Sequence, residues 1–154
     1  MFATNTFSYM WMTTAAIEAL HKNSGRIVVI SSLAGWIGPP KTAVYSATKH
    51  ALHGFFDSLR IELANMENKK YNNIGITIAS LGSHDTEGAA EVKHHVSKHV
   101  EWYPPVTAAR SVVTGAAAGK NEIFHPHLMV YPMLAMRPFF PKLCDFLLAA
   151  AYVW

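Results

Sequence analysis

The residues best suited to acid–base chemistry are a tyrosine and a lysine four positions apart, Tyr45 and Lys49. On a helix this spacing places both side chains on one face, one turn apart. A free phenol has a pKa of about 10 and is a weak proton donor at neutral pH, but a neighbouring ammonium favours the phenolate and lowers that pKa. A shift of about three units takes about 4 kcal/mol. Such a tyrosine can protonate a carbonyl oxygen or accept the proton of an alcohol.

Ser32 gives this pair a context. It lies thirteen residues before Tyr45 and closely follows the aliphatic run Ile27-Val28-Val29-Ile30, which is typical of a buried strand. A Tyr-x-x-x-Lys spacing alone arises by chance in roughly one chain in three, and an exposed tyrosine beside a solvated lysine is then the more common interpretation. A hydroxyl at the end of a strand, facing the pair, favours a catalytic site.

Two strands and the helix between them must position these residues. The aliphatic run predicts a strand over Arg26–Ile30 that is covered on both faces of a parallel sheet. After a loop rich in Gly and Pro, Leu33–Lys41, apolar spacing predicts a helix over Ala43–Met66 and a second strand over Ile74–Ala79. Together they form a βαβ unit. Ligands of such sheets bind beyond the carboxyl ends of the strands, where Ser32 lies.

The remaining segments predict further helices and one short strand. A helix with one apolar face covers Phe7–Leu20, and the polar segment Ser83–Val100 is rich in histidine. A helix at Val106–Ala118 precedes a short strand at Glu122–His125. The apolar stretch His127–Trp154 predicts short, broken helices because three prolines interrupt it: Pro132, Pro138 and Pro141.

The stretch from Ile27 to Phe56, IVVISSLAGWIGPPKTAVYSATKHALHGFF, resembles the core of short-chain dehydrogenases, closely that of the hydroxysteroid 11-beta-dehydrogenase group. The resemblance runs from about Met1 to Ala90 and continues more loosely beyond. It implies an α/β fold, a partial doubly wound parallel (Rossmann-like) sheet with C-terminal helices. Residues 1–126 are then the C-terminal half of the dehydrogenase domain, and residues 127–154 an apolar helical tail.

The resemblance also implies roles for four catalytic residues. Tyr45 is similar to the family's acid–base tyrosine, and Lys49 to the lysine that binds the nicotinamide ribose and tunes the tyrosine. Ser32 is similar to the serine that hydrogen-bonds the substrate oxygen. Asn5 stands where the family's fourth catalytic residue holds a water molecule in the proton relay, although a helix N-cap asparagine is an equally good interpretation of this position.

Cofactor and substrate positions follow from the same resemblance. Leu81, Gly82 and Thr86 match the segment that lines the nicotinamide in relatives, so we expect NADP(H), with NAD as the alternative. The substrate is expected to be a hydrophobic carbonyl compound or alcohol that contacts Ser32, Ala34 and Pro39. Steroid-reducing relatives often place a tyrosine where this chain has Pro39, so steroids, retinoids, other lipids and xenobiotic carbonyls all stay open.

The family's glycine-rich phosphate-binding turn has no counterpart in the chain. The segment Gly35-Trp36-Ile37-Gly38 is followed by two prolines and cannot begin a phosphate-binding helix. We therefore expect a truncated chain with little activity alone. The alternative is a non-catalytic form that pairs with intact subunits as an interaction or regulatory protein. Close relatives are anchored in the endoplasmic reticulum membrane, which the resemblance implies here too, with the anchor outside this chain.

Composition excludes several other functions. The net charge is +3 but its lysines and arginines are scattered, which argues against nucleic-acid binding. Cys144 is the single cysteine, so no internal disulfide forms. His94, His95 and His99 lack an acidic partner, so no metal site is expected. Half of the residues are apolar, which favours a homodimer or a shallow membrane-surface contact through the tail.

Overall fold

The computed structural model describes residues 1–65, 70–93 and 100–152. It contains a parallel three-stranded sheet in the order β1-β2-β3, formed by β1 (Arg26–Ser32), β2 (Gly75–Leu81) and β3 (Glu122–His125). Val29 of β1 lies opposite Ile78 of β2, which lies opposite Glu122 of β3. Parallel strands need crossover connections, and here helices supply them.

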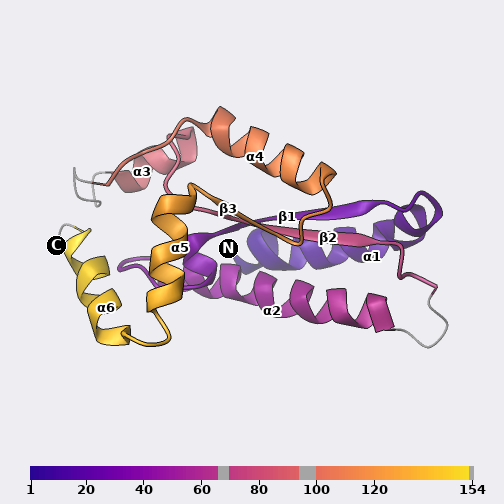
Figure 1. The fold of residues 1–154 in the computed structure, drawn as a ribbon, viewed down its shortest axis with the longest axis horizontal. Helices are drawn as coiled ribbons and strands as arrows, with labels where there is room; N and C mark the ends of the chain where they lie inside the picture. Colours follow the sequence, from indigo (N-terminus) through magenta and orange to yellow (C-terminus); the bar gives the residue numbers. More distant parts are fainter. Residues whose placement is uncertain (66–69, 94–99, 153–154) are drawn as a thin grey trace.

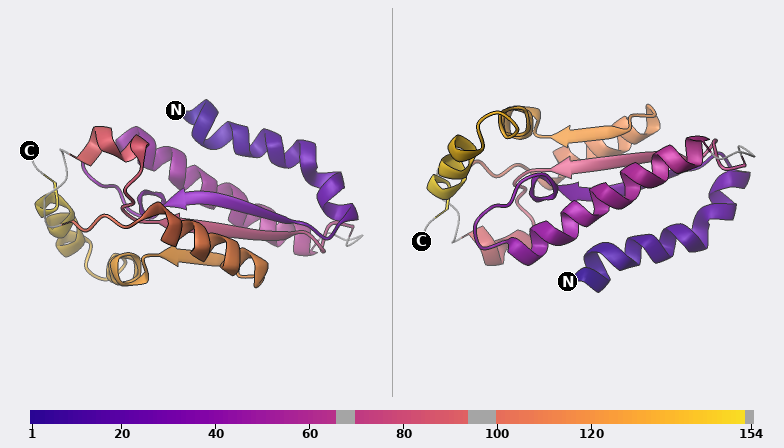
Figure 2. Two further views of the ribbon diagram at one scale, coloured as in Figure 1. Left: turned by 90° about the horizontal axis from the view of Figure 1, so that it is seen from above. Right: turned by 90° about the horizontal axis from the view of Figure 1, so that it is seen from below.

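Helices cover both faces of this sheet (Figure 1). Helix α1 (Ser8–Lys22), which continues a π-helical turn at Ala3–Phe7, and helix α2 (Ala43–Asn65) pack on one face. Helix α4 (Pro105–Ala117) packs on the other face, against β2 and β3. Three further helices lie at the end toward which the strand arrows point (Figure 2): α3 (Ala90–Lys93), α5 (His127–Met136) and α6 (Pro141–Ala150).

The main hydrophobic core lies between the sheet and the pair α1 and α2. Phe56 and Leu52 of α2 are fully buried against Val29 and Ile78, and α1 adds the partly buried Ile17. A smaller cluster joins β2 and β3 to α4 through Ala79, Ile123 and Val112. This arrangement confirms the predicted helices, strands and βαβ unit to within a few residues at their ends.

The second face of β1 departs from the prediction. The run of four aliphatic residues in β1 was expected to be covered on both faces. In β2, the five central residues are buried and the two end residues are half-buried. In β1, however, Val28 and Ile30 are 37% and 38% exposed. Helix α4 lies over β2 and β3, so this side of β1 is only partly covered, and within the described residues no strand pairs with its outer edge.

The apolar C-terminal tail folds into short helices, as the prolines predict. Pro138 lies in the turn between α5 and α6, and Pro141 begins α6. Pro132, however, lies inside α5 and does not break it. Many large apolar side chains of this tail are exposed, including Leu128, Phe139 and Phe146. Among the described residues, no helix combines the length and the apolar character needed to cross a membrane.

Candidate active site

Helix α2 presents Tyr45 and Lys49 at the carboxyl end of β1. The Lys49 side chain is only 8% exposed, and its Nζ donates a hydrogen bond of 2.9 Å to the backbone oxygen of Ile30. The same Nζ lies 5.7 Å from the centre of the half-buried Tyr45 ring. The structure thus brings the predicted tyrosine and lysine together at the end of a parallel strand.

Burial destabilises the charged form of Lys49. Removing the charged form from water lowers the pKa of Lys49 below its ordinary value. Of the three N–H donors that a lysine ammonium carries, only one meets a protein acceptor among the described residues. A buried cation with two donors left over is suited to bind hydroxyl groups of a ligand.

Tyr9 is a site residue that the sequence analysis missed. Its hydroxyl donates to the same Ile30 oxygen at 3.5 Å, and its ring centre lies 6.0 Å from Lys49 Nζ. Burial, followed by the nearby Tyr45, raises the pKa of Tyr9. The available signal was its spacing, because Tyr9 follows Asn5 by four residues and therefore lies on the same face of the N-terminal helix.

Asn5 connects to helix α2 through Thr48. Its Nδ2 donates to Thr48 Oγ1 at 3.3 Å, and that hydroxyl donates to the Tyr45 backbone oxygen at 2.6 Å. The neighbouring Thr6 donates to the Thr48 backbone oxygen at 3.1 Å. The N-cap interpretation of Asn5 is wrong. The N-cap residue is Phe2, and Asn5 lies inside the π-helical turn Ala3–Phe7.

Ser32 ends β1 in an extended conformation and begins a 3-10 turn, Leu33–Gly35. Its side-chain oxygen accepts a hydrogen bond of 3.1 Å from the backbone N–H of Ala34, which is buried. Half-buried Pro39 lies farther along the same loop and accepts a hydrogen bond of 2.7 Å from the Thr42 hydroxyl. The three predicted substrate contacts therefore lie at the end of β1 and in the segment that joins it to α2.

The predicted cofactor segment follows β2. Leu81 is the last residue of that strand, and the Gly82 N–H donates to the backbone oxygen of His125 at 2.8 Å. Thr86 is exposed, and its side chain accepts from the Ala89 N–H at 3.2 Å. These residues occupy the expected edge of the sheet, next to the end of β1.

Two histidines near this segment were not singled out from the sequence. His84 is buried, and its Nδ1 donates to the Gly82 oxygen at 3.0 Å while its Nε2 lies 2.9 Å from His125 Nδ1. Burial, followed by the nearby His84 and His127, lowers the pKa of His125. No group of three or more metal-binding side chains occurs within the described ranges. His94, His95 and His99 lie outside them.

A buried polar layer lies directly beneath the Ser32 turn. His53 of α2 is 6% exposed, its Nε2 lies 2.9 Å from Ser31 Oγ, and burial lowers its pKa to about 4. The Trp36 ring lies 4.4 Å from the His53 ring, centre to centre, and donates its indole N–H to Ser80 Oγ at 2.8 Å. Sequence analysis did not find this layer, because its members are far apart in the chain.

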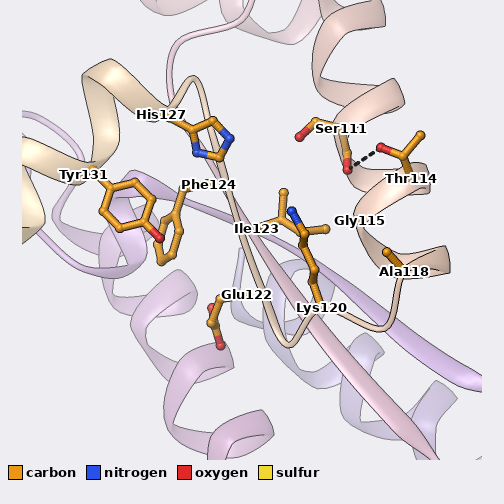
Figure 3. A pocket seen from close by; sticks show the side chains of 10 residues that line it. All are labelled: Ser111, Thr114, Gly115, Ala118, Lys120, Glu122, Ile123, Phe124, His127 and Tyr131. Carbon is orange, nitrogen blue, oxygen red and sulfur yellow. Dashed lines mark hydrogen bonds between the residues drawn. The ribbon is translucent and has the colours of Figure 1, made fainter.

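Two cavities lie away from Tyr45. One of about 420 Å³ lies at the outer edge of β3, between α4 and α5, and Figure 3 shows its lining side chains, among them Lys120, Glu122 and His127. The other, of about 440 Å³ and mostly apolar, is bounded by Trp36, Phe124 and part of α5. Neither of these two cavities is lined by Ser32, Tyr45 or Lys49.

With this geometry in place, comparison with known proteins settles the family. The sequence profile described as short chain dehydrogenase matches residues 1–97. The chain belongs to the short-chain dehydrogenase family. Hydroxysteroid 11-beta-dehydrogenase 1-like protein B of Xenopus laevis is 40% identical over 150 residues, which cover 97% of this chain and 50% of the relative. The hydroxysteroid 11-beta-dehydrogenase 1-like protein of Gallus gallus is 44% identical over 122 residues, covering 79% and 41%.

Solved structures of the family confirm the fold. A short-chain dehydrogenase from Burkholderia cenocepacia, in complex with NADP, matches with a TM-score of 0.79 at 21% identity, over 96% of this chain and 56% of that one. An actinorhodin polyketide ketoreductase variant with NADPH matches with a TM-score of 0.64 at 26% identity, over 79% and 54%. This short-chain dehydrogenase chain spans about half the length of the relatives it matches, so the N-terminal half of the fold is absent from these 154 residues.

The low pKa of His53 predicts how stability depends on pH. Between about pH 6.5 and about pH 4 the unfolded chain binds a proton at this histidine and the folded chain does not. We expect the free energy of unfolding to fall as the pH is lowered through this window, at up to about 1.4 kcal/mol per pH unit. Urea titrations at several pH values measure it.

The His53→Gln variant should show a shallower dependence on pH, whereas Ser58→Gln, which changes an exposed residue of the same helix that does not titrate, should keep the wild-type slope. Equal slopes in the wild type and His53→Gln would contradict the assignment.

Proposed function

We propose that the chain provides the catalytic half of an NADP(H)-dependent oxidoreductase that acts on a hydrophobic ketone or alcohol, steroid-like or another lipid. The observation that carries the proposal is the buried Lys49 ammonium beside Tyr45, with two N–H donors left over at the end of a parallel strand. A merely structural lysine would be expected to extend into solvent, because burying an ammonium costs several kcal/mol.

The described residues fit one end of the cofactor. The two remaining Lys49 donors suit ribose hydroxyls, and the Leu81-Gly82 backbone with Thr86 lies at the adjacent strand end, where the nicotinamide would rest. When bound, the reduced nicotinamide supplies a hydride to the carbonyl carbon. Nothing among the described residues is suited to the pyrophosphate, which a glycine-rich turn at a helix N-terminus holds in this class of fold.

The chain's own residues would manage the proton. As the carbonyl oxygen gains negative charge, the Tyr45 hydroxyl gives it a proton and the Ser32 hydroxyl donates a hydrogen bond to it. Lys49 stabilises the phenolate that remains. Asn5, which is held by Thr48, would orient the water that returns a proton to Tyr45. The reverse sequence oxidises an alcohol.

Substrate class and cofactor choice rest on the relatives. The Xenopus laevis and Gallus gallus proteins carry hydroxysteroid dehydrogenase names, and the Burkholderia cenocepacia structure holds NADP. The half-buried Pro39 would give the substrate side an apolar surface without a hydroxyl donor, whereas the structure buries Ala34, the other expected contact. That surface favours a hydrophobic carbonyl compound and leaves steroid specificity to be measured.

Substituting the two catalytic candidates tests the proposal. We expect Tyr45→Phe to lower kcat for NADPH-dependent reduction of a hydrophobic ketone by about 10²–10⁴, because the proton donor is removed. Lys49→Met should raise the KM for NADPH as well. The assay follows NADPH absorbance with a panel of steroid, retinal and aliphatic ketones.

The matched control is Tyr131→Phe, which removes an exposed tyrosine hydroxyl from α5. Full activity in Tyr45→Phe would overturn the catalytic assignment. The oxidoreductase proposal fails if the chain neither binds nor oxidises NADPH, both by itself and after mixing with the missing half of a relative.

A second proposal is that the chain pairs with another subunit, either a copy of itself or an intact relative, without catalysis of its own. Helix α2 supports it, because the large apolar side chains of Val44 and Ile61 are 57% and 65% exposed. We expect the chain to elute as a dimer in size-exclusion chromatography with light scattering. Ile61→Glu should shift it to a monomer.

Val113→Glu is the matched control, since Val113 is 67% exposed but lies on α4, on the opposite face of the sheet. A monomeric wild-type chain that also fails to co-purify with a full-length relative would remove this proposal. Co-purification without any NADPH-dependent activity would favour it over the catalytic one.

The tail supports a further proposal, a shallow membrane-surface contact, consistent with location at the endoplasmic reticulum membrane. Phe139 lies in the turn between α5 and α6 and is 77% exposed, and Phe146 of α6 is 68% exposed. Lys142 of the same helix α6 adds a cation to this tail. We expect the chain to float with anionic phospholipid vesicles, and Phe139→Glu with Phe146→Glu to reduce flotation severalfold. Val113→Glu should not change it, and equal flotation of all three proteins would contradict the proposal.

A further inference from the structure

His53 is a buried imidazole that the acid–base scheme leaves without a role. It follows Lys49 by four residues and Tyr45 by eight on α2, so all three side chains project from one side of the helix. Tyr45 and Lys49 lie at the end of β1, whereas His53 lies one turn further along, beneath the turn that follows Ser32.

Three contacts join His53 to the segment around Ser32. Its Nε2 lies 2.9 Å from Ser31 Oγ, one residue before Ser32. A Cβ atom at Gly35 would lie 2.7 Å from the His53 ring, so the backbone of the 3-10 turn rests directly on the imidazole. The Trp36 ring covers the imidazole at 4.4 Å between centres and is itself held by Ser80.

These contacts bracket Ser32 on both sides. Ser31 precedes it, and Gly35 and Trp36 close the turn whose second residue, Ala34, donates its N–H to Ser32 Oγ. That bond occupies an acceptor position of the hydroxyl and leaves its hydrogen available to donate to a substrate oxygen. The direction of the Ser32 hydroxyl therefore depends on the position of the turn, and the turn rests on His53.

One protonation state of His53 accounts for its surroundings. Its Nδ1 has no hydrogen-bond partner among the described residues. An unpaired N–H donor is costly when buried, so Nε2 carries the hydrogen and donates it to Ser31 Oγ. Burial, with additional repulsion from His50, Arg60 and Lys49, lowers the pKa of His53 to about 4 and keeps the ring neutral at ordinary pH.

We propose that His53 is a positioning residue: its contacts with Ser31, Gly35 and Trp36 hold the turn in the conformation that directs the Ser32 hydroxyl toward the substrate side. The inference deepens the proposed function, since it assigns a support to the serine of that same site. His53 does not touch substrate or cofactor and takes no part in proton transfer.

The Ala34 amide offers a direct readout, because its hydrogen bond goes to Ser32 Oγ and to no other side chain. Amide hydrogen exchange measured by NMR on the 154-residue chain reports how firmly that bond is held. This readout needs neither cofactor nor substrate. Two further amides serve as internal controls: that of Ile78 in the sheet and that of Ala89, which donates to Thr86 in a similar turn elsewhere.

Four variants define the experiment. His53→Phe keeps a ring beneath Trp36 but loses the bond to Ser31, whereas His53→Gln places an amide N–H near the position of imidazole Nε2. Ser31→Ala removes the same bond from its other end with little change in volume. His50→Phe makes the matched substitution at an exposed site on the same helix.

We expect His53→Phe and Ser31→Ala each to accelerate Ala34 exchange about tenfold, with Ile78 and Ala89 unchanged. In the double variant His53→Phe with Ser31→Ala, Ala34 exchange should be no faster than in either single variant, because the two substitutions remove the same interaction. His53→Gln should stay within about twofold of the wild type, as should His50→Phe. In a preparation that reduces a ketone, His53→Phe should lower kcat and leave the KM for NADPH unchanged.

Wild-type exchange at Ala34 in His53→Phe would overturn the inference. So would a double variant in which the two accelerations multiply, or a His53→Gln variant as fast as His53→Phe, which would indicate packing alone. If His53→Phe does not fold, as judged by Ile78, the smaller Ser31→Ala change decides by the same criterion. An Ala34 response, together with no NADPH-dependent reduction even after mixing with the missing half of a relative, would support the positioning role while refuting the proposed function.

Discussion

The hydrogen bond from the Lys49 ammonium to the Ile30 backbone oxygen ties the site to the sheet. It joins the second turn of α2 to the end of β1, and it holds the Lys49 ammonium at a position that is almost fully buried. Tyr9 reaches the same oxygen from α1. Two helices and a strand therefore meet at one carbonyl group, and the Tyr45 ring lies next to the Lys49 ammonium that binds it.

The two faces of the sheet at β1 differ in how completely helices cover them. The α1 and α2 face has a dry core around Phe56 and a buried polar layer around His53, so the helix that carries the catalytic candidates is firmly packed. The opposite face of β1 is open at Val28 and Ile30. A strand with the composition of a sheet centre thus lies at a sheet edge, which agrees with a chain that spans half the length of its relatives.

Local sequence was sufficient for much of the fold. Apolar spacing predicted α1, α2 and α4, the aliphatic runs predicted β1 and β2, and the prolines predicted the broken helices of the tail. It was insufficient where burial depends on a partner from elsewhere, as in the open face of β1. It also misjudged Asn5 as a possible N-cap, because a π-helical turn starts before it and no local pattern distinguishes the two.

The sequence by itself determined that a tyrosine and a lysine share one helix face and that a serine ends the preceding strand, because these relations follow from the helical repeat and from chain order. Only the tertiary structure decided that the Lys49 ammonium is buried against β1, that Tyr9 joins it and that His53 supports the Ser32 turn. The reason is physical: burial, hydrogen-bond partners and pKa values depend on distances between residues that are remote in the chain, and only packing sets those distances.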